Sequence, residues 1–100
     1  WRIHKNRLSA FYGTNLELLL RGLGVRTVLV VGVLTNQCVA ATSKDAYYRD
    51  IKPIVVEEAT GTTLPHLHAP AIEMIQVGWG AVHSLTETLT NLEELGIPNC

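Results

Sequence analysis

The sequence of 100 residues carries little charge and no concentration of either sign. Only 17% of its residues are charged, and eight basic residues against nine acidic ones give a net charge of −1. Without a Lys/Arg-rich stretch, the usual electrostatic signature of nucleic-acid binding or of binding to an anionic membrane is missing. No apolar run reaches the roughly 20 residues of a membrane-spanning helix, and the first residues do not have the pattern of a signal peptide. We therefore expect no nucleic-acid or membrane partner, and a cytoplasmic protein.

Cysteine is also scarce, because Cys38 and Cys100 are the only two in the sequence. They are too few and too far apart for a disulfide framework, and no CxxC spacing indicates structural zinc. The apolar content is 47%, which is typical of a globular protein, and the length fits one domain. The sequence starts at Trp1 rather than Met and enters at once into polar residues. We therefore expect residues 1–100 to form a single domain in partial form, the C-terminal portion of a longer one.

Along the chain, segments whose apolar residues follow helical spacing alternate with continuous runs of β-branched apolar residues. The β-branched runs are typical of strands buried on both faces of a parallel sheet. The predicted elements, in order, are a helix at 16–23, a strand at 27–33, a helix from 39 to about 49, a strand at 52–56, a polar loop at 57–65, a helix at 69–77, a short edge strand at 81–84 and a helix at 86–95. This alternation predicts an α/β fold with three α/β/α layers, Rossmann-like, around a mainly parallel sheet.

Cys38 lies just beyond the carboxyl end of the first predicted strand, where open α/β sheets bind their ligands. If Thr35 or Asn36 caps the next helix, Cys38 falls in its first turn. The unpaired N–H groups and the positive end of the helix dipole there favour a thiolate, which is a nucleophile. A small cysteine that simply packs beneath the sheet fits this position equally well. The position alone therefore leaves both interpretations open.

Several spaced motifs accompany this cysteine. They are Lys5–Phe11 followed by Gly13–Leu16, then Gly32–Val39 with Thr42 and Asp45-Ala46, and then Val55–Ala59. In this order, and over nearly the whole chain, they resemble the isochorismatase-like cysteine hydrolases, a family that includes nicotinamidases, N-carbamoylsarcosine amidases, and ureidoacrylate and biuret hydrolases. Cys38 separates the chain from true isochorismatases, which lack this nucleophile. The run from Thr35 to Cys38 is most similar to that of the ureido-type amidases.

The resemblance implies an isochorismatase-like hydrolase fold and a set of catalytic groups. Cys38 would be the nucleophile and Lys5 the cation beside it. The backbone N–H groups of Leu34 and Cys38 would form the oxyanion hole, with a cis peptide bond between Val33 and Leu34. The implied reaction is cleavage of a C–N bond in a small amide or ureide through a thioester on Cys38. No cofactor or metal ion is expected, and the family usually assembles into homo-oligomers.

One catalytic residue of the family has no counterpart in this sequence. It is an aspartate at the end of the first strand, which serves as general acid and base, and no such segment precedes Lys5. Asp45 and Asp50 lie on or after the helix that follows the cysteine, and Glu57 and Glu58 match other family positions, so none of the four replaces it. We therefore expect the chain to hold roughly the C-terminal half to two-thirds of the family's domain.

The remaining candidate residues favour structural roles. His66 and His68 have no acidic or thiol companions, so we interpret them as loop or capping residues rather than metal ligands. Phe11, Tyr12 and Trp79 are aromatic and fit the wall of a substrate pocket, but such residues in an α/β chain belong more often to the core or to an interface. The turn around Trp79 predicts an exposed aromatic residue at an oligomer interface. No substrate-binding residue is assigned.

Two other functions compete with the hydrolase. A catalytically inactive relative or fragment would keep the fold as an oligomerisation or binding module. A thiol redox sensor would need a second, resolving cysteine, and Cys100 at the far end of the chain is poorly placed for that role.

Overall fold

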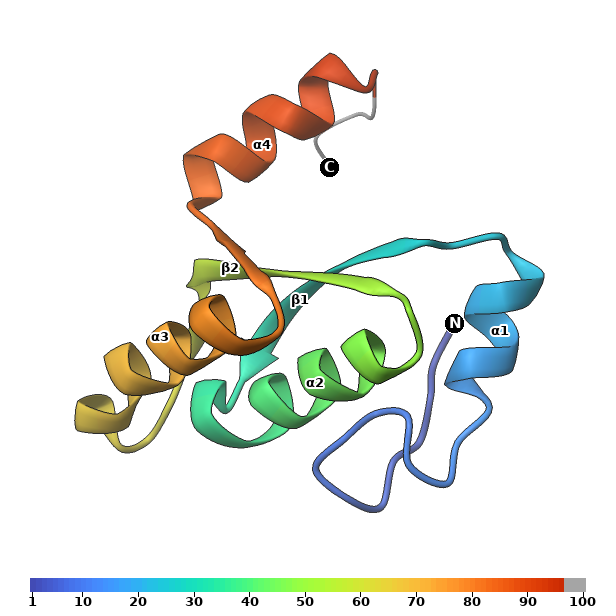
Figure 1. Ribbon diagram of the computed structural model, residues 1–100, viewed down its shortest axis with the longest axis horizontal. Coiled ribbons are helices and arrows are strands. Elements are labelled where there is room, and N and C mark those ends of the chain that lie inside the picture. The colour runs from blue at the N-terminus through green and yellow to red at the C-terminus, as the bar shows by residue number, and fades with distance from the viewer. Residues whose placement is uncertain (97–100) are drawn as a thin grey trace.

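Three parallel strands form one sheet in the order β1-β2-β3 (Figure 1). The computed structural model describes residues 1–96, so Pro98 and Cys100 lie outside the described part. The elements are α1 (Leu16–Gly22), β1 (Thr27–Val33), a π-helical turn η1 (Thr35–Val39), α2 (Ala40–Tyr48), β2 (Lys52–Gly61), a 3-10 turn η2 (Pro65–Leu67), α3 (His68–Gly78), β3 (Ala81–His83) and α4 (Leu85–Glu94). The predicted α/β fold with a parallel sheet is confirmed.

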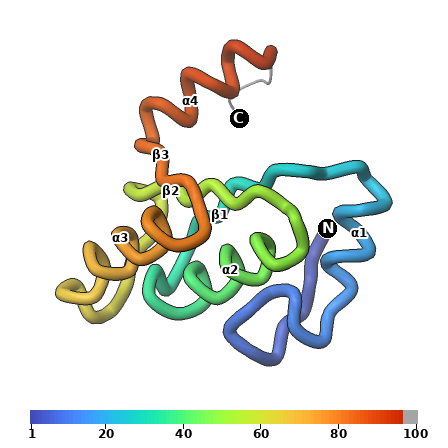
Figure 2. Tube along the Cα trace, viewed as in Figure 1, coloured from blue at the N-terminus to red at the C-terminus, as the bar shows by residue number. Residues whose placement is uncertain are grey.

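The helices lie on both sides of this sheet. Helices α2 and α3 cover one face, and α4 lies on the other, as Figure 2 shows. The second face is only partly covered, because a groove of 420 Å³ separates α4 from Leu29 and Ile54. Val31 and Val33 of β1 are 56% and 67% exposed. The prediction that β1 is buried on both faces is therefore wrong for the described chain, in which only α4 covers the second face.

Strand β2 is longer than the sequence predicted, because it continues to Gly61 through the segment expected to be a loop. Val55 pairs with Val30 of β1, and after an irregularity Thr60 pairs with Gly32. Four residues lie between Val55 and Thr60 but only one lies between Val30 and Gly32, so β2 departs from regular pairing there, as in a β-bulge. As a result β1 is paired up to Val33, its last residue, and the start of η1 is held in place.

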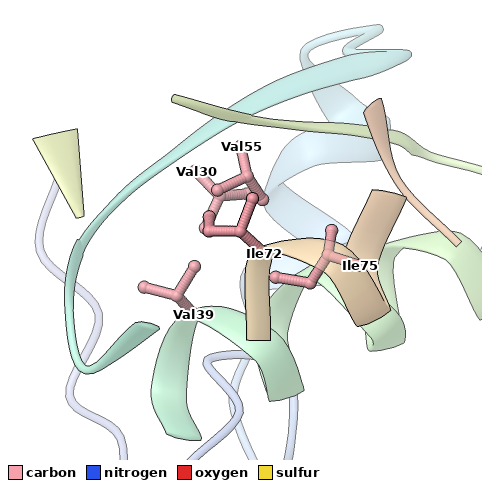
Figure 3. Packing of buried hydrophobic residues seen from close by; sticks show 5 residues of the cluster. All are labelled: Val30, Val39, Val55, Ile72 and Ile75. Atoms are coloured by element: carbon pink, nitrogen blue, oxygen red, sulfur yellow. The ribbon is translucent and has the colours of Figure 1, made fainter. Parts of the chain in front are cut away.

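A buried apolar cluster joins the sheet to η1 and α3. Figure 3 shows its members, which are Val30, Val39, Val55, Ile72 and Ile75. Val39, which follows Cys38 directly, is 3% exposed. The core therefore anchors the end of the turn that carries the cysteine.

Ile75 is the side chain with which we test this core. It is fully buried, so Ile75→Val should lower the free energy of unfolding by about 1 kcal/mol, because it leaves a methyl-sized gap. Val77 on the same helix is 83% exposed. The control Val77→Ala removes more atoms, yet it should change stability by less than about 0.5 kcal/mol. Urea denaturation measures both, and equal effects would contradict this assignment of the core.

Residues 1–15 form no helix or strand, and side chains attach them to α2. The backbone N–H of Ala10 donates to Oγ1 of Thr42 at 3.0 Å. Phe11 packs in a second buried cluster with Ala46 and Ile51. These contacts hold the segment that contains Lys5 against the beginning of α2.

Glu17 of α1 adds an ionic attachment between α1 and α2. Its carboxylate accepts from Nε of Arg21 at 3.2 Å and from Nε of Arg49 at 2.7 Å. Hydrogen bonds from these two guanidinium groups hold the pKa of Glu17 below its usual value, and the bond from Arg21 has the larger effect. A carboxyl group whose pKa is lowered by folding stabilises the protein above its unfolded pKa of about 4.3. This stabilisation is lost as the pH falls through the lower folded pKa.

We therefore expect Glu17→Gln to destabilise the protein at pH 7 and to have a smaller effect at pH 2.5, because the carboxyl group loses its charge as the pH falls. Urea denaturation at the two pH values measures the difference. Glu73→Gln, on the exposed side of α3, is the matched control and should leave the pH dependence of stability as it is in the parent. A Glu17→Gln effect of equal size at both pH values would contradict the ionic origin of the contact.

Candidate active site

The candidate site lies at the carboxyl end of β1, where the chain turns into η1. The peptide bond between Val33 and Leu34 is cis, at the position that the resemblance implies. The carbonyl oxygen of Leu34 then accepts from the N–H groups of Gln37 at 3.1 Å and Val39 at 3.0 Å. The hydrogen bond from the N–H of Val39 reaches back five residues, as in a π-helix, and the N–H of Cys38 takes no part in it.

The cap of this helix differs from the prediction. Leu34 occupies the N-cap position, with extended backbone angles and no side-chain capping bond, so neither Thr35 nor Asn36 is the cap. Cys38 nevertheless lies in the first helical turn, as predicted, because η1 continues directly into α2.

Lys5 and Cys38 meet although they are far apart in the sequence. Nζ of Lys5 lies 3.4 Å from Sγ of Cys38 and also donates to the carbonyl oxygen of Arg7 at 3.2 Å. Cys38 is half-buried, whereas Lys5 is exposed. The ammonium group and the N-terminal end of the helix both place positive charge near the sulfur. The fold thus brings a half-buried thiol group and a cation into contact.

His68 contacts this site from α3, a contact that the sequence analysis missed. Its Nδ1 lies 2.9 Å from Oγ1 of Thr35, the first residue of η1. Thr35 is fully buried and His68 is half-buried. His68 ends η2 as its C-cap and begins α3, so it is a capping residue as predicted, but its side chain also contacts Thr35, whereas His66 is exposed on η2. No motif links Thr35 to His68, so no sequence signal predicted their contact.

The three aromatic candidates have different environments. Phe11 is buried in the core, and Tyr12 is exposed. Trp79 is half-buried, its Nε1 donates to Oγ of Ser43 at 3.0 Å, and Nζ of Lys44 lies 4.7 Å from its ring centre. The prediction of an exposed aromatic turn is wrong, because α2 provides both a hydrogen-bond acceptor and a cation for this indole.

Two of the acidic residues considered as substitutes for the family's aspartate are engaged in other contacts. Asp45 pairs with Arg49 at 3.5 Å, and Oε1 of Glu58 accepts from the N–H of Leu85 at 3.0 Å. Among residues 1–96, no group of three or more His, Cys, Asp or Glu side chains is arranged to hold a metal ion. Within the same residues, every helix is too short or too polar to cross a membrane.

Known proteins resemble this chain in sequence and in fold. The sequence model of the isochorismatase domain matches residues 1–89. Ureidoacrylate amidohydrolase RutB from Methylorubrum extorquens is 39% identical over 79 residues, which are 78% of this chain and 32% of that protein. N-carbamoylsarcosine amidase from Arthrobacter sp. is 36% identical over 93 residues, which are 93% of this chain and 35% of that protein.

A solved structure with the same arrangement is that of an isochorismatase-like hydrolase from Alkaliphilus metalliredigens. It superposes with a TM-score of 0.86 and 28% sequence identity, over 89% of this chain and 48% of that one. The chain thus spans about a third of the length of the two curated relatives and about half of the length of this structure.

Proposed function

Because this chain belongs to the isochorismatase domain family, we propose that it is part of a cysteine hydrolase that cleaves a C–N bond in a small amide or ureide. The contact of 3.4 Å between Nζ of Lys5 and Sγ of Cys38 is the observation that carries the proposal. The names of the two curated relatives, a ureidoacrylate amidohydrolase and a carbamoylsarcosine amidase, support the substrate class.

In the first step, the thiolate of Cys38 attacks the carbonyl carbon of the substrate and a C–S bond forms. The N–H groups of Leu34 and Cys38 receive the negative oxygen of the tetrahedral intermediate. The π-helical bond from Val39 to Leu34 supports this role, because it leaves the N–H of Cys38 out of that contact. The C–N bond then breaks, the nitrogen takes up a proton and leaves as ammonia or an amine, and a thioester remains on Cys38.

In the second step, water attacks the thioester carbon, a C–O bond forms and the C–S bond breaks. The thiolate returns to the cation of Lys5, and the acid product leaves. Both steps need a group that gives and takes protons. Asp45 and Glu58 are engaged in other contacts, and the resemblance places the family's aspartate at the end of a strand that comes before Lys5. We therefore assign this role to a carboxylate outside residues 1–100.

The test of this function is to intercept the thioester. The protein is incubated with a panel of small ureides and amides in the presence of hydroxylamine, which should divert the acyl group of an amide to a hydroxamate and the carbamoyl group of a ureide to a hydroxyurea. Mass spectrometry of acid-quenched samples should locate an acyl or carbamoyl adduct on the peptide that contains Cys38. Consumption of substrate with neither hydroxylamine product nor adduct would overturn the covalent mechanism.

Two further expectations accompany this function and stay predictions. The first is assembly into a homo-oligomer, which the exposed apolar side chains Val31 and Leu89 would favour. The second is residence in the cytoplasm.

A further inference from the structure

The contact between Thr35 and His68 joins the candidate site to a separate helix. Thr35 begins η1, and its fully buried hydroxyl lies 2.9 Å from Nδ1 of His68, the first residue of α3. Buried hydroxyl groups in proteins are nearly always hydrogen-bonded, because a lost partner is not replaced by water. The imidazole of His68 is the hydrogen-bond partner of the Thr35 hydroxyl.

This contact acts on the part of the backbone that the proposed reaction uses. Thr35 follows Leu34 directly and lies three residues before Cys38, so it stands between the two N–H groups proposed for the oxyanion hole. Three other restraints hold the turn, namely the pairing of Val33 with Gly61, the hydrogen bonds to the Leu34 carbonyl and the burial of Val39. The first two act on the backbone and the third on the last residue of η1, whereas His68 acts on the side chain of its first residue.

The neighbouring polar side chain does not provide such a restraint. Oδ1 of Asn36 is buried and has no hydrogen-bond partner among residues 1–96. Thr35 is therefore the residue through which a side-chain hydrogen bond connects this end of η1 to α3.

We propose that His68 is a positioning residue of the hydrolase, which acts through the hydroxyl of Thr35 to hold the N–H groups of Leu34 and Cys38 toward the developing oxyanion. This inference rests on the proposed function. An oxyanion hole works only when its donors are aligned before the reaction, so a loosened turn should slow the chemical step more than it weakens substrate binding.

The variants are chosen for the position of the polar atom at residue 68. Asparagine places a polar atom near the position of Nδ1, glutamine places one near Nε2, and leucine has none. We expect His68→Leu and His68→Gln to lower kcat about tenfold with KM within about twofold, and His68→Asn to restore most of kcat. The exposed His66 lies two residues away, and His66→Leu is the matched control, with kinetics expected to equal those of the parent.

A double-mutant cycle with Thr35 tests whether His68 affects kcat through the hydroxyl of Thr35. Thr35→Val should lower kcat as much as His68→Leu does, and the double variant should be no slower than either single one, because the two changes remove the same contact. Thr35→Ser keeps the hydroxyl and should stay close to the parent. Two results would overturn the inference. One is a double variant in which the effects of the two substitutions on kcat multiply. The other is a kcat per folded molecule that His68→Leu leaves unchanged.

The outcome for His68 is separable from the outcome for the proposed function. If the parent protein turns over its substrate and the His68 variants match it, only this inference fails. If the parent shows no turnover, the rate of alkylation of Cys38 by iodoacetamide decides. An alkylation rate changed about threefold by His68→Leu and restored by His68→Asn would support the positioning role. An unchanged rate would overturn it.

Discussion

Cys38→Ala should reduce the proposed turnover of small amides and ureides by about 10³-fold or more, because the variant has no atom that can form the proposed thioester. The sulfur is half-buried at the start of a helix and has Lys5 within 3.4 Å, so the residue is accessible and its removal leaves the core intact. Release of ammonia or amine, followed at saturating substrate, measures the effect. Circular dichroism should show the same secondary structure as in the parent.

Two other variants test that this loss belongs to the sulfur of Cys38. Cys38→Ser keeps the size and polarity of the side chain but offers a hydroxyl that ionises far less readily than a thiol, so it should be nearly as inactive as the alanine variant. Cys100→Ala removes the other cysteine of the sequence and should retain the parent's kcat. A Cys38→Ala variant that retains more than about a tenth of the parent's kcat would show that another group attacks the substrate.

Lys5→Met should lower kcat by about 10²-fold, because it removes a cation that faces the negative charge formed during the reaction. The same variant should slow the alkylation of Cys38 by about fivefold at pH 7, since an exposed ion pair contributes at most about 1 kcal/mol to the thiolate. Methionine keeps most of the length of the lysine side chain, so the change isolates the charge. Steady-state kinetics and iodoacetamide labelling measure the two effects.

Lys44→Met is the matched control for this experiment. Lys44 is also exposed, but its ammonium lies over the ring of Trp79 at 4.7 Å from the ring centre. Its replacement should leave both kcat and the alkylation rate within about twofold of the parent. If Cys38 is alkylated as fast in the Lys5→Met variant as in the parent, the contact between Nζ of Lys5 and Sγ of Cys38 does not activate the cysteine in solution.

Local sequence patterns predicted the elements of the fold well. The β-branched run at 27–33 is strand β1 to the residue, and the predicted helix at 86–95 is α4, which Ser84 caps by accepting from the N–H of Glu87. These features depend on neighbours within a few residues, so a single sequence contains the information for them. The prediction of a loop at 57–65 was wrong for its first half, because pairing with the end of β1 decided the extent of β2.

The candidate site was only partly visible in the sequence. The place of Cys38 after β1 made it a candidate, but its role and that of Lys5 came from the resemblance to a family of hydrolases, because no local pattern connects a lysine to a cysteine far along the chain. The contact between Thr35 and His68 was not predicted at all. A buried threonine and a histidine at a helix entrance are each ordinary, and their partnership depends on how α3 packs against η1.

The sequence by itself determined the alternation of helices and strands and the placement of a cysteine at the carboxyl end of β1, because periodicity and capping act over short stretches of chain. Tertiary structure alone decided which side chains meet that cysteine. Lys5 reaches it because Thr42 and the cluster around Phe11 hold the N-terminal segment on α2. His68 reaches the same turn because α3 packs on the sheet beside it. Such contacts join residues distant in sequence, and they exist only once the layers have packed.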